Sequence, residues 1–281
     1  MASLIRAKKS LGQNFLKSKQ AAHSIIRAAN ITPGNIILEI GPGKGFLTKE
    51  LLASVAHVGS GKVIAVEKDD ALVPFLQELF AKEIATGMFQ LIHADILPWK
   101  PEEHGLADHS YKLIANIPYY ITGAIVRKFL GNAKSQPERM VLMLQKEVAE
   151  RISARDGKES LLSLSVKAYG NPHYIEKVAA KYFSPEPNVD SAILLIENIS
   201  REFFTDISEE TFFNLIHLGF AHKRKQLVGN LAGENLPRET ILKVFKEIGI
   251  PDKARAEDIS LPQWKELAKH LQRYFGGKLN T

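Results

Sequence analysis

The 281-residue sequence contains no cysteine and no hydrophobic run long enough to cross a membrane. Without cysteine there is no disulfide framework, no thiolate zinc site and no cysteine nucleophile. A membrane-spanning helix requires about 20 apolar residues, and the N-terminus lacks the apolar core of a secretory signal. The nine histidines show no metal-ligand spacing. We therefore expect a cytoplasmic protein with neither a metal site nor a nucleophilic triad.

Acidic residues are missing from the first twenty positions, although the whole chain carries 37 basic and 31 acidic residues. This segment holds +5 of the net charge of +6, on Arg6, Lys8, Lys9, Lys17 and Lys19. A second basic cluster is expected on the first helix of the C-terminal region, at Lys223, Arg224 and Lys225. Basic patches on a near-neutral body indicate a polyanionic partner such as nucleic acid, with a solvated surface as the alternative.

Five apolar runs alternate with helical patterns in the first half of the chain, at residues 36–40, 62–66, 90–94, 111–115 and 140–144. Near-continuous apolar strands separated by helices predict a parallel sheet that is covered on both faces. Residues 173–179 and 191–196 predict a closing antiparallel pair, whereas residues 161–168 fit a helix or a strand. The fold class is therefore expected to be α/β.

From about residue 203 the pattern is helical. Apolar residues recur with helical spacing in three stripes, and the first stripe holds Phe212, Leu215, Ile216 and Phe220. The third stripe follows a capping-box pattern at 260–263. We therefore divide the chain into an α/β domain at residues 1–199 and a small all-helical domain at residues 200–281.

The first four strands end at residues suited to binding a ligand, namely Gly41, Glu67, Asp95 and Asn116. In open α/β sheets ligands bind outside the carboxyl ends of the strands, so these residues are expected to converge on one crevice. Gly41 and Gly43 permit positive φ and close approach of a ligand. A dinucleotide fingerprint would need glycine in place of Phe46, and Pro42 removes an N–H donor. A ligand without phosphate groups fits this loop better.

The two acids narrow the choice of ligand. Glu67 can accept hydrogen bonds from both hydroxyls of a ribose, and Asp95 can accept from an adenine amino group. Either acid alone could be a surface carboxylate. Together with the glycine loop they describe a nucleoside without phosphate, and S-adenosylmethionine is the commonest cofactor of that kind.

The segment Asn116–Tyr119 supplies what an aromatic amine needs to become a nucleophile. The Asn116 side-chain oxygen and a carbonyl before or at Pro118 can hold the amine hydrogens and free its lone pair. Tyr119 offers a ring for stacking on the base, and Phe183, in a turn with two prolines, is expected to cover its other face. The alternatives are an ordinary Asn-Pro turn with a packed tyrosine and a core phenylalanine.

With these residues in view, the chain closely resembles the KsgA-type ribosomal RNA adenine N6-dimethyltransferases. The resemblance covers roughly residues 8–275. The matching stretches are KSLGQNFL (9–16), EIGPGKGFLT (39–48), VEKD (66–69), DIL (95–97), NIPYYIT (116–122), FSPEPNVDS (183–191), FAHKRK (220–225) and RAEDIS (255–260). Residues 59–61 depart from the family as a loop insertion, and Gly219 and His222 alter a helix that is usually more regular.

The resemblance implies a Rossmann-like class I methyltransferase domain followed by a helical domain that contacts RNA or the ribosome. It implies an S-adenosylmethionine site lined by Asn14, Leu16, Gly41, Glu67, Asp95 and Asn116, to which the loop reasoning adds Gly43. It implies catalysis by residues 116–119 and a target base held between Tyr119 and Phe183. The implied substrate is a pair of adjacent adenosines near the 3′ end of small-subunit ribosomal RNA, dimethylated in an assembling 30S particle. We expect the protein to act as a monomer, although the sequence does not determine the oligomeric state.

Three alternatives compete with this interpretation. The antibiotic-resistance branch, which methylates large-subunit ribosomal RNA, shares Gln-Asn-Phe and Asn-Ile-Pro-Tyr, but the match at 255–257 favours the assembly branch. An RNA-binding factor that lost the chemistry is disfavoured by the intact Glu67, Asp95 and residues 116–119. A nucleotide-linked oxidoreductase is disfavoured by Phe46.

Overall fold

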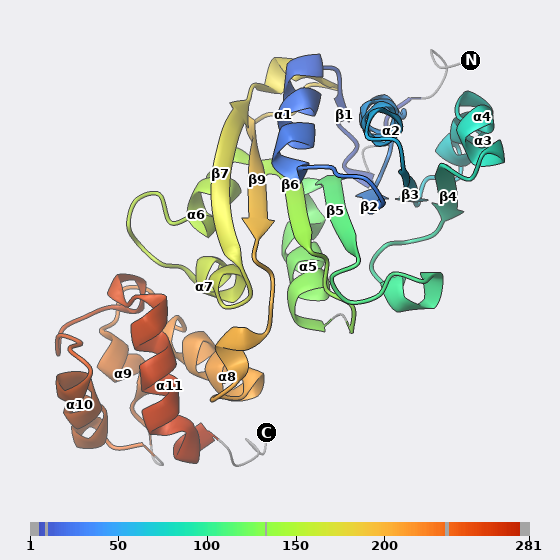
Figure 1. Ribbon diagram of the computed structural model, residues 1–281. Coiled ribbons are helices and arrows are strands. Elements are labelled where there is room, and N and C mark those ends of the chain that lie inside the picture. The colour runs from blue at the N-terminus through green and yellow to red at the C-terminus, as the bar shows by residue number, and fades with distance from the viewer. Residues whose placement is uncertain (1–5, 9–10, 133, 234–235, 276–281) are drawn as a thin grey trace. The chain divides into compact units, whose positions relative to one another are not determined.

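The computed structural model describes residues 6–8, 11–132, 134–233 and 236–275, and it divides into two compact units (Figure 1). The first unit comprises the chain up to Ala149 together with Asn171–Ile199, and the second comprises Glu150–Gly170 together with the chain from Ser200 onward. The break after Ile199 coincides with the boundary expected from sequence. Residues 150–170 differ from that expectation, because they cluster with the C-terminal helices and not with the sheet domain.

The first unit is built on a seven-stranded sheet, as the apolar runs predict. In sheet order its strands are β4 (Phe89–His93), β3 (Gly61–Glu67), β2 (Asn35–Ile40), β5 (Tyr111–Asn116), β6 (Arg139–Gln145), β9 (Ser191–Glu197) and β7 (Asn171–Val178). The pairs from β4 to β6 are parallel, and β9 joins β6 and β7 antiparallel. This arrangement confirms both the parallel sheet and the closing antiparallel pair.

Helices of the first unit cover the sheet and connect its strands. They are α1 (Lys19–Ala29), α2 (Phe46–His57), α3 (Leu72–Leu79), α4 (Ala81–Ala85) and α5 (Thr122–Val126), with a 3-10 turn η3 (Tyr119–Ile121) before α5. The helix α1 begins where the Ser18 hydroxyl accepts from the Ala21 N–H, and it ends at Asn30 in the left-handed region. It packs against α2 and against β6, β7 and β9 (Figure 1).

Strand register brings the predicted ligand residues to one edge of the sheet. Ile40 pairs with Val66 of β3 on one side and with Ala115 of β5 on the other. The next residues along these three neighbouring parallel strands are therefore Gly41, Glu67 and Asn116. Because Glu67 in turn pairs with His93 of β4, Asp95 follows at the same edge.

Apart from an isolated β-bridge between Gly233 and Leu236, the second unit contains only helices and turns among the residues that the structure describes. After α6 (Lys146–Ile152), which enters this unit from the first, they are α7 (Leu161–Lys167), α8 (Glu209–Gly219), α9 (Leu227–Leu231), α10 (Arg238–Glu247) and α11 (Leu261–Phe275). Phe212, Leu215 and Trp264 are fully buried in its core. The ambiguous segment 161–168 is thus helical. The predicted capping box is present, because Ser260 and Gln263 bond reciprocally at the start of α11.

The basic cluster Lys223–Lys225 does not lie on a helix, contrary to expectation. The helix α8 ends at Gly219, and residues 221–226 form an exposed turn before α9. At Gly219 a side chain would overlap the indole of Trp264, so close packing between α8 and α11 accounts for the glycine at this departure from the family. We call residues 222–225 the basic turn.

No helix in the described parts of the chain combines the length and apolar character needed to cross a bilayer.

Candidate active site

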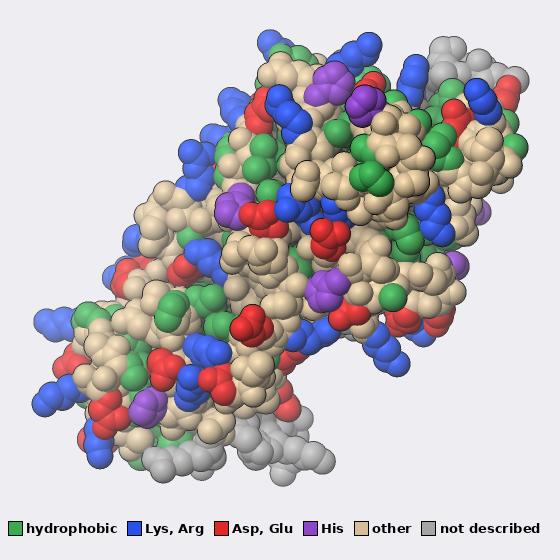
Figure 2. Space-filling model, in the orientation of Figure 1, with side chains coloured by type: hydrophobic (Ala, Val, Ile, Leu, Met, Phe, Trp, Pro, Cys, Tyr) green, Lys and Arg blue, Asp and Glu red, His purple; other side chains and the backbone are tan. Residues whose placement is uncertain are grey.

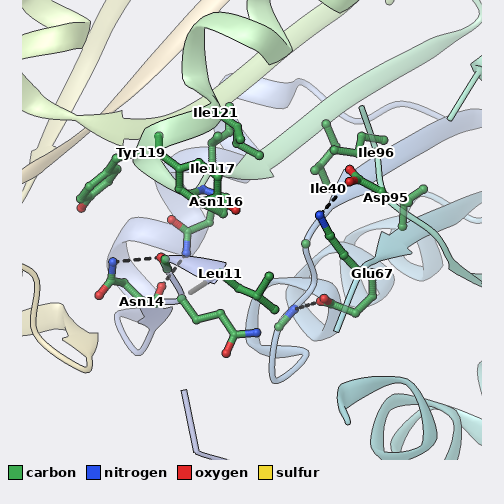
Figure 3. A pocket seen from close by; sticks show the side chains of 18 of the residues that line it. Leu11, Asn14, Ile40, Glu67, Asp95, Ile96, Asn116, Ile117, Tyr119 and Ile121 are labelled. Atoms are coloured by element: carbon green, nitrogen blue, oxygen red, sulfur yellow. Dashed lines mark hydrogen bonds and ion pairs between the residues drawn. The ribbon is translucent and has the colours of Figure 1, made fainter. Parts of the chain in front are cut away.

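A pocket opens at the sheet edge where β2, β3, β4 and β5 end (Figure 3). Its walls come from residues 11–15 ahead of α1, from the glycine loop, from the ends of β3 and β4, and from residues 116–121. Of the residues proposed from sequence, it brings together Asn14, Gly41, Gly43, Glu67, Asp95, Asn116, Pro118 and Tyr119.

The glycine loop follows β2 with its backbone in the left-handed region. Gly41 and Gly43 have φ values of 66° and 59°, which glycine adopts without steric cost. A Cβ on Gly43 would lie 2.9 Å from the Phe15 ring, whereas a Cβ on Gly41 would meet no atom within 4 Å. The loop therefore packs tightly on one side and leaves open space beside Gly41 on the other.

Glu67 is buried, at 5% exposure, and is held by two backbone donors. Its Oε1 accepts from the Asp69 N–H at 2.8 Å and its Oε2 accepts from the Gly43 N–H at 3.1 Å. Burial raises the pKa of Glu67, and these two N–H groups oppose the shift. Each carboxylate oxygen keeps a second lone pair, so a ligand with two adjacent hydroxyls finds fixed acceptors here.

Asp95 forms an ion pair with Lys68 at the mouth of the pocket. The Lys68 ammonium lies 2.7 Å from Asp95 Oδ2, and the Leu97 N–H donates to Oδ1 at 3.0 Å. Burial disfavours the charged carboxylate, but the Lys68 and Leu97 hydrogen bonds outweigh it and hold the pKa of Asp95 below its usual value. Asp95 therefore stays an acceptor at neutral pH.

The Asn116 side chain is oriented by the backbone of the segment that crosses the pocket. Its Nδ2 donates to the Asn14 carbonyl at 3.0 Å, and Figure 3 shows the side chain between Asn14 and Tyr119. Because the amide nitrogen is engaged, the Oδ1 acceptor is the free end of the amide.

Tyr119 is half-buried, and its hydroxyl lies 2.8 Å from Ser191 Oγ. Burial raises the pKa of Tyr119, so the phenol stays neutral. The Pro118 carbonyl accepts from the Ile121 N–H at 3.1 Å within the turn that leads into α5. The hydroxyl contact anchors the tip of the Tyr119 side chain, and the residue lines the same pocket as Asn116.

Comparison with known proteins shows the family of the chain. A family model described as ribosomal RNA adenine dimethylase matches residues 5–273. The chain belongs to this family. Its relatives include proteins named ribosomal RNA small subunit methyltransferase A. The one from Dehalococcoides mccartyi (strain CBDB1) is 44% identical over 94% of this chain and 88% of the relative, and the one from Fusobacterium nucleatum is 37% identical over 93% and 96%.

Solved structures agree with the Rossmann-like methyltransferase fold. The 23S ribosomal RNA methyltransferase ErmE superposes with a TM-score of 0.73 at 25% identity, covering 92% of this chain and 100% of that one. A dimethyladenosine transferase from Plasmodium falciparum superposes with a TM-score of 0.75 at 24% identity over 92% and 98%. As a member of the dimethylase family the chain is an S-adenosylmethionine-dependent ribosomal RNA adenine dimethyltransferase, which confirms the resemblance seen in the sequence.

The pocket fits the cofactor of a dimethylase. The open space beside Gly41 admits a ligand close to the backbone. Glu67 presents a desolvated carboxylate, and Asp95 a charged one, along the same wall. Among the described residues that line the pocket the only cation is Lys68, and it is already paired with Asp95, which suits a nucleoside cofactor without phosphate groups.

Two residues proposed from sequence lie outside the pocket. Leu16 and Phe183 pair across the short strands β1 (Phe15–Leu16) and β8 (Phe183–Ser184), and they are 6% and 2% exposed within the hydrophobic core. Burial of their apolar side chains explains the difference. Phe183 therefore presents no free face to a base in this conformation, contrary to the stacking role expected for it.

Tertiary contacts also change the charge that the N-terminal segment of residues 1–20, here called the basic arm, presents to a partner. Lys8 pairs with Asp69 and Asp70 at 2.6 and 2.8 Å, so its charge is already matched by two carboxylates. Arg6 is exposed, and Lys9 lies outside the described residues.

Sequence reasoning missed several residues that the pocket uses. Gln13 and Tyr120 line it, and Lys68 pairs with its acid Asp95. Tyr120 is 64% exposed at the rim, with its ring against Gly12. A signal was present, because Lys68 adjoins Glu67 at a strand end and Tyr120 adjoins Tyr119, but only the pairing of distant segments reveals their partners.

Proposed function

We propose that this dimethylase binds S-adenosylmethionine in the pocket of Figure 3 and methylates N6 of two adjacent adenosines near the 3′ end of 16S ribosomal RNA. The observation that carries the proposal is the orientation of the Asn116 amide at the end of β5, where its Nδ2 donates to the Asn14 carbonyl. Glu67 is assigned to the ribose hydroxyls, Asp95 to the adenine amino group of the cofactor, and Asn116 to the amine of the target base.

Three groups of the chain would prepare the target amine. When bound, the cofactor supplies an electrophilic methyl group on a sulfonium. Asn116 Oδ1 accepts one amine hydrogen. The Ile117 carbonyl accepts the other, because the Pro118 carbonyl points into the turn, where the Ile121 N–H donates to it. Holding both hydrogens turns the nitrogen lone pair out of conjugation with the ring. Tyr119, fixed through Ser191, positions the base, so that most of the rate enhancement comes from orientation.

The choice of the small subunit rests on the relatives. Those named small subunit methyltransferase A reach 37–44% identity over nearly the whole chain, whereas the 23S enzyme ErmE is 25% identical. We extend the proposal to action on an assembling 30S particle, as a monomer in the cytoplasm.

RNA contact is assigned to a subset of the exposed cations for which the described parts of the chain show no ion pair. In the second unit we select Lys223, Arg224 and Lys225 of the basic turn, because these three exposed cations are consecutive. In the first unit Lys17 bonds through its N–H to the Tyr182 carbonyl, which brings Lys17 and Lys19 beside Lys181. Figure 2 shows lysine and arginine side chains along the edge that β7 forms in this unit. Arg6 completes the set.

The proposal is tested by incubating the enzyme with unmethylated small and large ribosomal subunits and labelled S-adenosylmethionine. Nucleoside mass spectrometry should then find N6,N6-dimethyladenosine at two adjacent positions of the small-subunit RNA alone. Label in the large-subunit RNA would assign the protein to the resistance branch instead. Absence of label from both RNAs, with a folded protein that binds the cofactor, would refute the assignment of Asn116.

A further inference from the structure

Residues 11–16, here called the strap, run across the pocket from the end of β3 to the end of β5. At its far end Phe15 and Leu16 form β1 and pair with β8. In the middle the Asn14 carbonyl receives the Asn116 amide. Leu11, Gly12 and Gln13 line the pocket between these points and the β3 end. The strap is therefore part of the wall of the site, although it precedes the sheet in sequence.

The near end of the strap is fastened to the turn after β3 by side chains. Lys8 Nζ lies 2.6 Å from Asp69 Oδ1, and Gln13 Nε2 donates to Asp69 Oδ2 at 2.7 Å. Gln13 Oε1 also accepts from the Lys8 N–H at 2.8 Å. Asp69 Oδ2 is thus bonded to the strap directly, through Gln13, and Asp69 Oδ1 is bonded to Lys8, which precedes the strap.

Asp69 connects this fastening directly to Glu67. Its backbone N–H donates to Glu67 Oε1 at 2.8 Å, and its Oδ1 also accepts from the Ala71 N–H at 3.0 Å. Its side chain is only 1% exposed, whereas the neighbouring Asp70, which reaches the same Lys8 ammonium at 2.8 Å, is 78% exposed. Hydrogen bonds to a buried charged group contribute more than a solvent-screened surface pair. Asp69 therefore dominates the contact, and Asp70 serves as a natural control.

We propose that Lys8, Gln13 and Asp69 form a latch that closes the strap over bound S-adenosylmethionine and limits how fast the cofactor leaves. Asp69 is a positioning residue in this scheme, because it touches the strap and Glu67 and not the reacting atoms. The inference rests on the proposed placement of the cofactor beside Glu67. A ligand held between Glu67 and Asn116 lies under the strap, so its exit requires the strap to lift, and lifting breaks the two side-chain contacts to Asp69.

The test measures cofactor exchange and needs no RNA. Protein loaded with tritiated S-adenosylmethionine is chased with excess unlabelled S-adenosylhomocysteine, and retained label is followed by rapid filtration. Lys8→Met, Gln13→Leu and Asp69→Asn should each speed dissociation by about tenfold, the effect of losing one hydrogen bond to a charged group. Asp70→Asn and Lys82→Met, the latter at an exposed lysine of α4, should stay within about twofold of the parent, as expected for surface charges.

A second measurement separates the latch from a general loosening of the fold. Hydrogen exchange should accelerate at the amides of residues 11–14 in the latch variants, while the amides of β2 and β5 stay protected. Lys8→Arg, which keeps the cation, should restore slow dissociation. If Asp69→Asn fails to fold, Lys8→Met and Gln13→Leu decide the question, because Lys8 is exposed and Gln13 lies on the strap.

Parental dissociation rates in folded Lys8→Met and Gln13→Leu proteins would overturn the latch. That result would leave the proposed function intact if Glu67→Ala still weakened cofactor binding. Unchanged affinity in Glu67→Ala would instead remove the cofactor from this pocket, and the two failures are therefore distinguishable.

Discussion

Replacing Glu67 with alanine should weaken cofactor binding by at least tenfold while the fold survives. Glu67 is 5% exposed and accepts from the Gly43 and Asp69 N–H groups. Two hydrogen bonds from ribose to this carboxylate would be worth roughly 1.5–3 kcal/mol each. Water enters the cavity left by the side chain and recovers part of that sum, and a tenfold loss corresponds to about 1.4 kcal/mol. The orphaned N–H groups should also cost about 1–3 kcal/mol of folding free energy each if they stay dry.

Isothermal titration calorimetry with S-adenosylmethionine measures the affinity directly, and thermal unfolding with and without cofactor gives an independent value. A saturating ligand stabilises the parent by an amount that grows with the ratio of ligand concentration to dissociation constant, so the variant should gain less. Asp70→Ala, an exposed acid three residues away in the same turn, is the matched control and should bind as the parent does. Parental affinity in a folded Glu67→Ala protein would refute the assignment of Glu67 to the ribose.

Four further predictions follow from the same structure. Asn116→Ala should slow both methyl transfers by several hundredfold, since one preorganised polar contact is worth about that factor. Tyr119→Ala should release monomethyladenosine. Full dimethylation at the parental rate in that variant would exclude the Tyr119 ring from stacking on the base. Neutralising the basic turn should flatten the salt dependence of binding to ribosomal subunits, with cofactor affinity unchanged; an equal salt slope would leave these charges as solvated surface. Burial raises the pKa of Glu39 from 4.5 to about 8. Between these two values the folded state binds a proton that the unfolded state releases, so the free energy of unfolding should fall as pH rises from about 4.5 to 8. In urea unfolding, Glu39→Gln should lack this pH dependence, and a pH dependence equal to that of the parent would contradict the assignment.

Local sequence patterns predict most of the secondary structure and the sheet edge where the pocket lies. Apolar runs such as residues 36–40 and 62–66 predict buried parallel strands, because a sheet covered on both faces leaves no strand face for polar residues. Parallel strands end at a common edge, so Gly41, Glu67 and Asn116 could be brought together from sequence alone. The helical stripe around Phe212 and the capping box at Ser260 are local in the same way.

Other features were decided by contacts between distant segments. The local sequence around Leu16 and Phe183 does not show that they are buried. Their pairing across β1 and β8 places both in the core. Lys8 belongs to the basic arm in the sequence, yet it forms an ion pair with Asp69, sixty-one positions away. The helix α8 ends at Gly219 with Trp264 against it, which leaves the basic turn outside any helix.

The difference between the two groups is physical. The period of a strand or helix depends on near neighbours, which the sequence displays in order, so element type and the polar residues at strand ends follow from it. The partner of a buried ring or a lone charge depends on which surfaces close on it when the chain folds, and burial of apolar area or of a carboxylate overrides local tendency. The sequence therefore determined the edge of the sheet at which the pocket lies. Tertiary structure determined which side chains face the pocket there and which segment forms its remaining wall.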